Sequence, residues 1–131
     1  MGTPMSGSMI HLEPDGTSVW VALLRGKKLW VLFPPETDLS LLRTNSKSIT
    51  EWFIVDYPKL KNNTNCKVYE HVQTKQEIIY VPHGWYHAVI NLTTTVAISE
   101  NVINKQNYLN VVQVLGDKEP ELVKDLILYY N

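Results

Sequence analysis

Hydrophobic and polar residues alternate over short stretches of the chain as far as about residue 101. These stretches are rich in β-branched, aromatic and aliphatic residues and end at turn signals such as Pro14-Asp15-Gly16. The pattern predicts short strands over residues 9–13, 18–24, 28–33, 66–72, 77–81, 85–92 and 95–101. Short connections at residues 25–27 and 93–94 predict two hairpins, each joining the strands on either side.

Helical signals mark three other segments of the chain. Ser48 can cap a short helix, because Glu51 follows three residues later, and Pro58 stops that helix. Residues 105–115 and 120–130 carry apolar residues at helical spacing, which predicts two further helices. Strands followed by helices indicate a mainly β fold, a small antiparallel barrel or sandwich with helical cover.

The chain has 131 residues, of which 44% are hydrophobic, so it can form one hydrophobic core. We expect a β core over residues 8–102 and helices packed on that core over residues 103–131. The start, residues 1–7, has little sequence information, and we expect it to be disordered or foreign to the natural protein.

Composition excludes several classes of function. A formal net charge of −1 gives no sign of a polybasic nucleic-acid binder, so a nucleic-acid partner is not expected. The single cysteine, Cys66, excludes a disulfide framework within the chain and a zinc site built on several thiolates. We expect neither a membrane span nor a signal peptide.

One pattern carries candidate chemistry. His11 and Glu13 are two residues apart on a predicted strand, so their side chains should point to the same face. His87, at the start of a later predicted strand, is the best candidate for a third ligand. Two histidines and one carboxylate form the facial triad of non-haem iron oxygenases. Spacing alone also fits a structural histidine beside a solvated glutamate, and this alternative stays open at this point.

The sequence around these residues resembles the Jumonji-C (JmjC) family. The run HLEPDGTSVWVALLRGKKLWVLFP, residues 11–34, is similar to the first metal strand and the hairpin of JmjC domains. Residues 80–101, beginning YVPHGWYHAVINL, are similar to the family's distal histidine region, and residues 49–58 to its short helix. The resemblance extends from about residue 7 to 102 and is strongest to the lysyl-hydroxylase group once called phosphatidylserine receptors.

The resemblance implies a double-stranded β-helix, the jelly-roll or cupin-like barrel, that binds Fe(II) and 2-oxoglutarate. His11, Glu13 and His87 match the metal ligands, although the family usually has Asp where Glu13 stands. Lys28 matches the basic residue that binds the distal carboxylate of 2-oxoglutarate. The implied activity is hydroxylation of a protein side chain, which gives a hydroxylysine or removes an N-methyl group.

Three further residues match co-substrate positions of the family. Ser99 stands where relatives carry a threonine that binds the same carboxylate, Asn101 matches a nearby asparagine, and Ser8 stands where relatives often have threonine. Val21 departs from the family, because close relatives carry an asparagine there that helps to hold the co-substrate. Ser8, Ser99 and Asn101 are therefore candidates for co-substrate binding, and a plain structural role is the alternative for each.

The resemblance also implies a protein or peptide substrate, such as a histone or another nuclear protein, and a nuclear or cytoplasmic location. Only ten residues precede His11, which implies an excised core or a minimal member of the family. A barrel without a flanking strand leaves an open sheet edge, which favours a homodimer or pairing with another chain. Two alternatives remain: an inactive JmjC-like binding or scaffold module, and a generic cupin that binds metal without 2-oxoglutarate.

Overall fold

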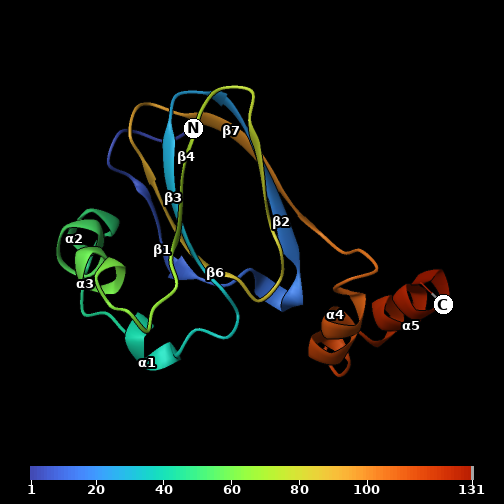
Figure 1. Cartoon of the computed structure of the whole chain (residues 1–131). Coiled ribbons are helices and arrows are strands. Elements are labelled where there is room, and N and C mark those ends of the chain that lie inside the picture. The colour runs from blue at the N-terminus through green and yellow to red at the C-terminus, as the bar shows by residue number, and fades with distance from the viewer. Residues whose placement is uncertain (131) are drawn as a thin grey trace.

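Two antiparallel β-sheets face one another in the computed structural model, which describes residues 1–130 (Figure 1). The strand order is β1-β6-β3-β4 in one sheet and β5-β2-β7 in the other. The strands are β1 (Gly7–His11), β2 (Ser18–Arg25), β3 (Lys28–Phe33), β4 (Tyr69–Gln73), β5 (Ile78–Val81), β6 (Tyr86–Asn91) and β7 (Val96–Val102). The helices are η1 (Pro14–Gly16), α1 (Leu39–Leu42), α2 (Ile49–Val55), α3 (Tyr57–Lys61), α4 (Tyr108–Leu115) and α5 (Pro120–Tyr130). The mainly β, cupin-like fold was therefore predicted correctly.

Alternation along the strands separates an inner and an outer apolar surface. On the inner side, Trp30 and Val89 of the four-stranded sheet pack against Val19, Val21 and Val81 of the other sheet. Successive side chains of a strand point to opposite faces, so the neighbours of these residues point outward. The two sheets thus share a small apolar core that fills part of the space between them.

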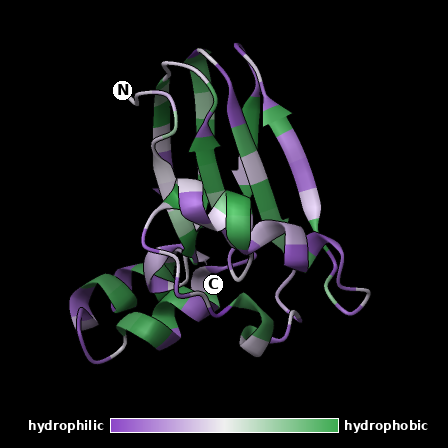
Figure 2. Cartoon of the chain, turned by 90° about the vertical axis from the view of Figure 1, so that its left-hand side faces the viewer, coloured by the Kyte–Doolittle hydropathy of each residue, from purple (hydrophilic) through white to green (hydrophobic). Residues whose placement is uncertain are grey.

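The outer face of the four-stranded sheet is covered by α2 and α3. Phe33 and Ala88 on this face belong to one buried cluster with Trp52, Tyr57 and Leu60 of the two helices. Figure 2 shows hydrophobic residues along the strands and on the helices at the lower end of the view. Helix α2 begins as predicted, because its N-cap Ser48 accepts a hydrogen bond from the backbone N–H of Glu51 at 3.1 Å.

Both predicted hairpins are wrong. β2 and β3 lie in different sheets, and so do β6 and β7, so each short connection crosses from one sheet to the other. The two connections contact each other instead: Leu92 N–H donates to the Lys27 carbonyl at 2.9 Å, and Lys27 N–H donates to Thr93 Oγ1 at 3.0 Å. Gly26 has a φ of +91°, and a Cβ there would lie 2.3 Å from the Thr94 carbonyl oxygen. A short glycine-containing link therefore serves a crossing as well as a hairpin.

Both ends of the chain contact other elements of the structure. In the start, the N–H groups of Gly2 and Met5 donate to the carbonyls of Thr95 and Asn91, and the Asn91 N–H donates to the Ser6 carbonyl. Helix α4 packs against η1, and α5 packs against α4. No residue of α5 is buried, so this helix lies beside α4 rather than against the sheets, as Figure 1 shows.

None of the helices within residues 1–130 has the length and hydrophobicity needed to span a lipid bilayer. The four-stranded sheet ends at β1 and β4, and the three-stranded sheet ends at β5 and β7. Dimerisation through one of these edges stays a prediction.

Candidate active site

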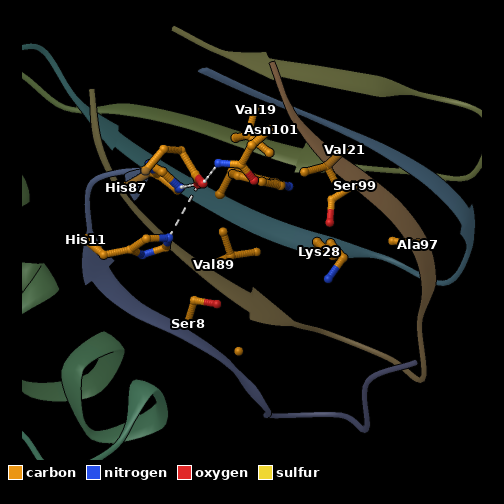
Figure 3. Close-up of a pocket in the computed structure, with 13 residues that line it drawn as sticks. Ser8, His11, Val19, Val21, Lys28, His87, Val89, Ala97, Ser99 and Asn101 are labelled. Carbon is orange, nitrogen blue, oxygen red and sulfur yellow. Dashed lines mark hydrogen bonds and ion pairs between the residues drawn. The ribbon is translucent and has the colours of Figure 1, made fainter. Parts of the chain in front are cut away.

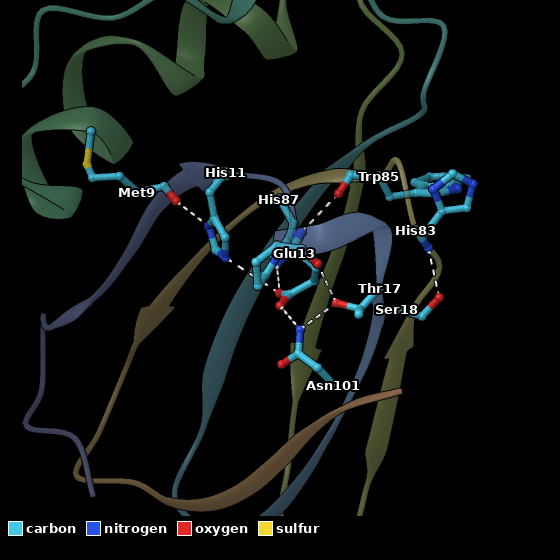
Figure 4. Close-up of polar contacts among 10 residues, drawn as sticks. Met9, His11, Glu13, Thr17, Ser18, His83, Trp85, His87 and Asn101 are labelled. Carbon is cyan, nitrogen blue, oxygen red and sulfur yellow. Dashed lines mark hydrogen bonds and ion pairs between the residues drawn. The ribbon is translucent and has the colours of Figure 1, made fainter. Parts of the chain in front are cut away.

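Three potential metal ligands meet between the two sheets (Figure 4). His11 ends β1 and is paired in the sheet with His87 of β6. The register of this pairing shifts between Ser8 and His11, an irregularity of the kind that changes the direction of a strand end. Glu13 lies beyond the strand, but its φ of −64° and ψ of 144° keep the backbone extended, so its carboxylate still reaches the two imidazoles. Ligand atoms of the three side chains all lie within 4.8 Å of one another.

Backbone carbonyls fix both imidazole rings. Nδ1 of His11 lies 2.7 Å from the Met9 carbonyl oxygen, and Nδ1 of His87 lies 3.0 Å from the Trp85 carbonyl oxygen. A carbonyl oxygen can only accept, so each Nδ1 donates its proton, and in the neutral ring the lone pair is then on Nε2. The two Nε2 atoms lie 3.6 Å (His11) and 3.1 Å (His87) from the same oxygen, Oε1 of Glu13.

This arrangement fits a bound cation. His87 is only 2% exposed, and burial lowers its pKa despite the opposing effects of the Trp85 carbonyl and Glu13. In the neutral His87 ring with its proton on Nδ1, the Nε2 lone pair faces the Glu13 carboxylate oxygen, and a cation between the two is attracted to both. Two imidazole nitrogens and one carboxylate oxygen on one side of a metal ion are the donor set of non-haem Fe(II) oxygenases. The residues present therefore fit Fe(II).

Asn101 holds the carboxylate in place. Its Nδ2 donates to Oε2 of Glu13 at 2.7 Å and to Oγ1 of Thr17 at 2.9 Å. The Thr17 hydroxyl in turn donates to the Pro14 carbonyl at 2.7 Å, which ties the group to η1. Oε2 is thus occupied, and Oε1 faces the two imidazoles. Asn101, predicted as a co-substrate residue, contacts the metal-side carboxylate in this structure.

A cavity of about 230 Å³ extends from the three ligands between the sheets (Figure 3). This volume is small for a ligand pocket and suits a small metabolite rather than a peptide. All seven residues predicted for the site line it: Ser8, His11, Glu13, Lys28, His87, Ser99 and Asn101. Between the polar groups the wall is apolar and includes Val19, Val21, Val89 and Ala97. Polar groups separated by an apolar wall match a short dicarboxylic acid with methylene groups in its middle.

Lys28 supplies the positive charge of the cavity. Burial lowers its pKa, and its Nζ donates to Oδ1 of Asn91 at 2.8 Å. Among the described residues no carboxylate forms an ion pair with Lys28. A half-buried ammonium that hydrogen-bonds only a neutral amide still favours an anion. The cavity thus combines a potential metal-ligand set with a cation that has no carboxylate partner among the described residues.

Comparison with known families agrees with this geometry. The model of the family described as "JmjC domain, hydroxylase" matches residues 1–102, which is most of the chain. The chain belongs to the JmjC family. The sequence resemblance therefore predicted the family and the cupin-like fold correctly.

Several JmjC proteins are similar to most of this chain. The arginine-specific demethylase JMJ22 of Arabidopsis thaliana is 36% identical over 97% of the chain and 26% of its own length. The bifunctional arginine demethylase and lysyl-hydroxylase psr-1 of Caenorhabditis elegans is 36% identical over 82% of the chain and 29% of its own length. The 2-oxoglutarate and iron-dependent oxygenase JMJD4 homolog of Drosophila melanogaster is 32% identical over 88% of the chain and 26% of its own length. The chain spans less than a third of the length of these relatives.

Three residues around this JmjC site were not among the predicted site residues. Asn91, which binds Lys28, lies four residues after His87 on β6, so strand alternation alone could have placed it on the inner face. Trp30 stacks on His87 with ring centroids 6.0 Å apart. Gln73 is fully buried and accepts a hydrogen bond from the Trp30 indole at 2.9 Å. No local signal marks Gln73, because its place depends on the pairing of β4 with β3.

Proposed function

We propose that this JmjC domain is the core of an Fe(II)- and 2-oxoglutarate-dependent oxygenase that hydroxylates a protein side chain. The observation that carries the proposal is the presence of the two-histidine, one-carboxylate set and the Lys28 ammonium in one small cavity. The names of the relatives, which include 2-oxoglutarate- and iron-dependent oxygenase, demethylase and lysyl-hydroxylase, support it.

The residues have distinct parts in this activity. Nε2 of His11, Oε1 of Glu13 and Nε2 of His87 would hold Fe(II) from one side and leave the other side for co-substrate and oxygen. Fe(II) with 2-oxoglutarate and O₂ supplies an oxidant for a substrate C–H bond, with 2-oxoglutarate converted to succinate and CO₂. Lys28 binds the distal carboxylate, and the apolar wall excludes water from the co-substrate methylene groups. Asn101 keeps the Glu13 carboxylate turned toward the imidazoles.

The proposed substrate is a lysine or an N-methylated basic side chain of a protein, with histones and other nuclear proteins as first candidates. Relatives named arginine demethylase and lysyl-hydroxylase support a basic side chain. Mass spectrometry of lysine and methyl-arginine peptides after incubation with Fe(II), 2-oxoglutarate and ascorbate separates the two reactions. Hydroxylation adds one oxygen atom to the peptide, whereas demethylation removes one methyl group and releases formaldehyde.

Thermal unfolding with Mn(II), a redox-quiet substitute for Fe(II), tests the site directly. A ligand that binds only the folded state raises its stability, by about 2.7 kcal/mol at 100 times its Kd. We expect Mn(II) to raise the Tm and 2-oxoglutarate to raise it further. His87→Ala should abolish both effects. His71→Ala is the matched control, because the exposed His71 ring pairs with Glu77 at 3.3 Å and lies outside the cavity lining.

The other outcomes favour the alternative functions. Stabilisation by Mn(II) without any effect of 2-oxoglutarate would favour a metal-binding cupin. Stabilisation by neither ligand would contradict the oxygenase proposal and favour a JmjC-like binding or scaffold module. Equal responses of His87→Ala and wild type would show that the metal binds elsewhere.

A further inference from the structure

Lys28 lies at the boundary of two cavities. Besides the metal-side cavity of about 230 Å³, it lines a second cavity of about 350 Å³ on the side of the N-terminal segment. The second cavity is also lined by Gly2, Ser6, Asn91 and Thr95. A lysine ammonium sits on a flexible four-carbon stem, so it can turn toward either space. Some contact must therefore decide where the positive charge lies.

Asn91 provides that contact. Lys28 and Asn91 are paired directly opposite each other on β3 and β6, and Nζ of Lys28 donates to Oδ1 of Asn91 at 2.8 Å. His87 lies four residues earlier on the same strand and therefore on the same face. One strand thus carries both a metal ligand and the residue that places the ammonium group.

The Asn91 amide is itself held in one orientation. Its Oδ1 also accepts from the Thr95 hydroxyl at 3.0 Å, and its Nδ2 donates to Oγ of Ser6 at 2.9 Å. The Ser6 hydroxyl donates in turn to the Thr3 carbonyl at 2.7 Å, so its oxygen is left to accept from Asn91. A flipped amide would turn its N–H groups toward the Lys28 ammonium. The side chain is also buried, with 4% of its surface exposed, so the orientation is fixed by the hydrogen bonds.

The neutrality of this amide matters as much as its position. A carboxylate at the same place would form an ion pair with Lys28 and remove its attraction for a ligand carboxylate. An amide oxygen accepts one N–H of the ammonium and leaves the positive charge and two further donors for an anion. We infer that Asn91 is a positioning residue that holds the Lys28 ammonium at the boundary of the two cavities, within reach of the co-substrate, and leaves its charge uncompensated. This inference rests on the proposed function.

The test compares Mn(II) and 2-oxoglutarate binding by isothermal titration calorimetry in wild type, Asn91→Asp and Lys28→Met. We expect Asn91→Asp to bind Mn(II) like wild type and to bind 2-oxoglutarate about 10- to 100-fold more weakly, the range of a charged hydrogen bond. The loss of 2-oxoglutarate affinity in Asn91→Asp should not exceed the loss in Lys28→Met, since Asn91 acts through Lys28. Ser6→Ala disturbs the same amide without adding a charge to the core, and we expect a loss of about 2- to 10-fold.

Wild-type 2-oxoglutarate affinity in both Asn91→Asp and Ser6→Ala would overturn the inference. Equal losses of Mn(II) and 2-oxoglutarate affinity would also overturn it, because they would mark a purely structural role. If wild type binds Mn(II) but not 2-oxoglutarate, the proposed function fails and the inference fails with it. A selective loss of 2-oxoglutarate affinity, bounded by that of Lys28→Met, would support it.

Discussion

Gln73→Leu tests whether one buried amide supports the inner wall of the site. Gln73 is fully buried at the end of β4. Its Oε1 accepts from the Trp30 indole at 2.9 Å, and its Nε2 donates to the Val21 carbonyl at 2.8 Å and the Glu77 carbonyl at 3.1 Å. These bonds join β4 to β3, to β2 of the opposite sheet and to the loop before β5. Leucine has a similar size and removes all three.

The expected loss of stability follows from these bonds. Each net hydrogen bond contributes about 1 kcal/mol, and a buried donor left without a partner costs about 1–3 kcal/mol. The apolar leucine side chain offsets part of this loss, so we expect the free energy of unfolding to fall by about 2–4 kcal/mol. Such a loss is a large fraction of the roughly 5–15 kcal/mol typical of domains, but most of the protein should stay folded. The midpoint of thermal unfolding should fall by roughly 10 °C.

Urea unfolding of the metal-free protein, followed by tryptophan fluorescence and circular dichroism, measures this loss. Gln113→Leu on the exposed face of α4 is the matched control, and we expect a change within about 0.5 kcal/mol. Trp30→Phe removes one of the three hydrogen bonds of Gln73. The double variant should therefore lose less free energy of unfolding than the sum of the losses of the two single variants. A Gln73→Leu loss below about 1 kcal/mol, or full additivity with Trp30→Phe, would refute the reasoning.

Three other variants test separate parts of the molecule. Asn101→Ala should weaken Mn(II) binding about 10- to 100-fold in a calorimetric titration, because the carboxylate of the metal site loses its orienting donor. Several hydrogen bonds lower the pKa of Asp56, and the largest contribution comes from the Ser46 hydroxyl. The ionised Asp56 therefore stabilises the folded state fully above its ordinary pKa of about 4, and this stabilisation is lost as the pH falls below that value. Ser46→Ala should therefore move the midpoint of acid unfolding to higher pH. Gly26→Ala should lower the free energy of unfolding by about 2 kcal/mol or more, because φ is +91° and the Cβ would overlap the Thr94 carbonyl.

Each of these expectations has a contrary result. Unchanged Mn(II) affinity in Asn101→Ala would mean that the carboxylate does not need its donor. Coincident acid-unfolding curves for Ser46→Ala and wild type would remove the role given to the Asp56 hydrogen bonds. Gly84 is the control for Gly26, because it also has a positive φ, of +81°, but its Cβ would meet the nearest atom, Cγ of Pro35, only at 3.5 Å. Equal losses at the two glycines would exclude the overlap as a cause.

The strands could be predicted from the sequence, but their partners could not. Alternation and turn residues are local, and they placed β2, β3, β5, β6 and β7 within a few residues of their observed bounds. Whether Arg25-Gly26-Lys27 reverses the chain within one sheet or crosses to the other depends on contacts with residues 92–94, which lie far away in the sequence. The backbone hydrogen bonds of the start could not be predicted for the same reason, since its partners are Asn91 and Thr95.

The site was easier to predict where a residue's chemistry is rare and harder where it is common. His11, Glu13, His87 and Lys28 are groups whose joint presence in a family pattern points to one reaction, and the structure places them in one cavity. Asn101 shows the limit of assigning a role from a family pattern, because it was predicted to bind the co-substrate and its observed contact is with Glu13. Asparagine and glutamine side chains serve many structural roles, so only the three-dimensional pairing reveals which ones support a site.

The crossing connections have a consequence for how the protein is made. Because all consecutive strands except β3 and β4 lie in different sheets, neither sheet can be completed from one continuous stretch of chain. The metal ligands share this property, since His87 follows Glu13 by 74 residues. On the ribosome the first two ligands therefore emerge well before the third, and a nascent chain holds an incomplete coordination set until β6 has been synthesised and paired with β1. Binding of the metal would thus mark the end of folding and stabilise the finished domain rather than guide its early steps.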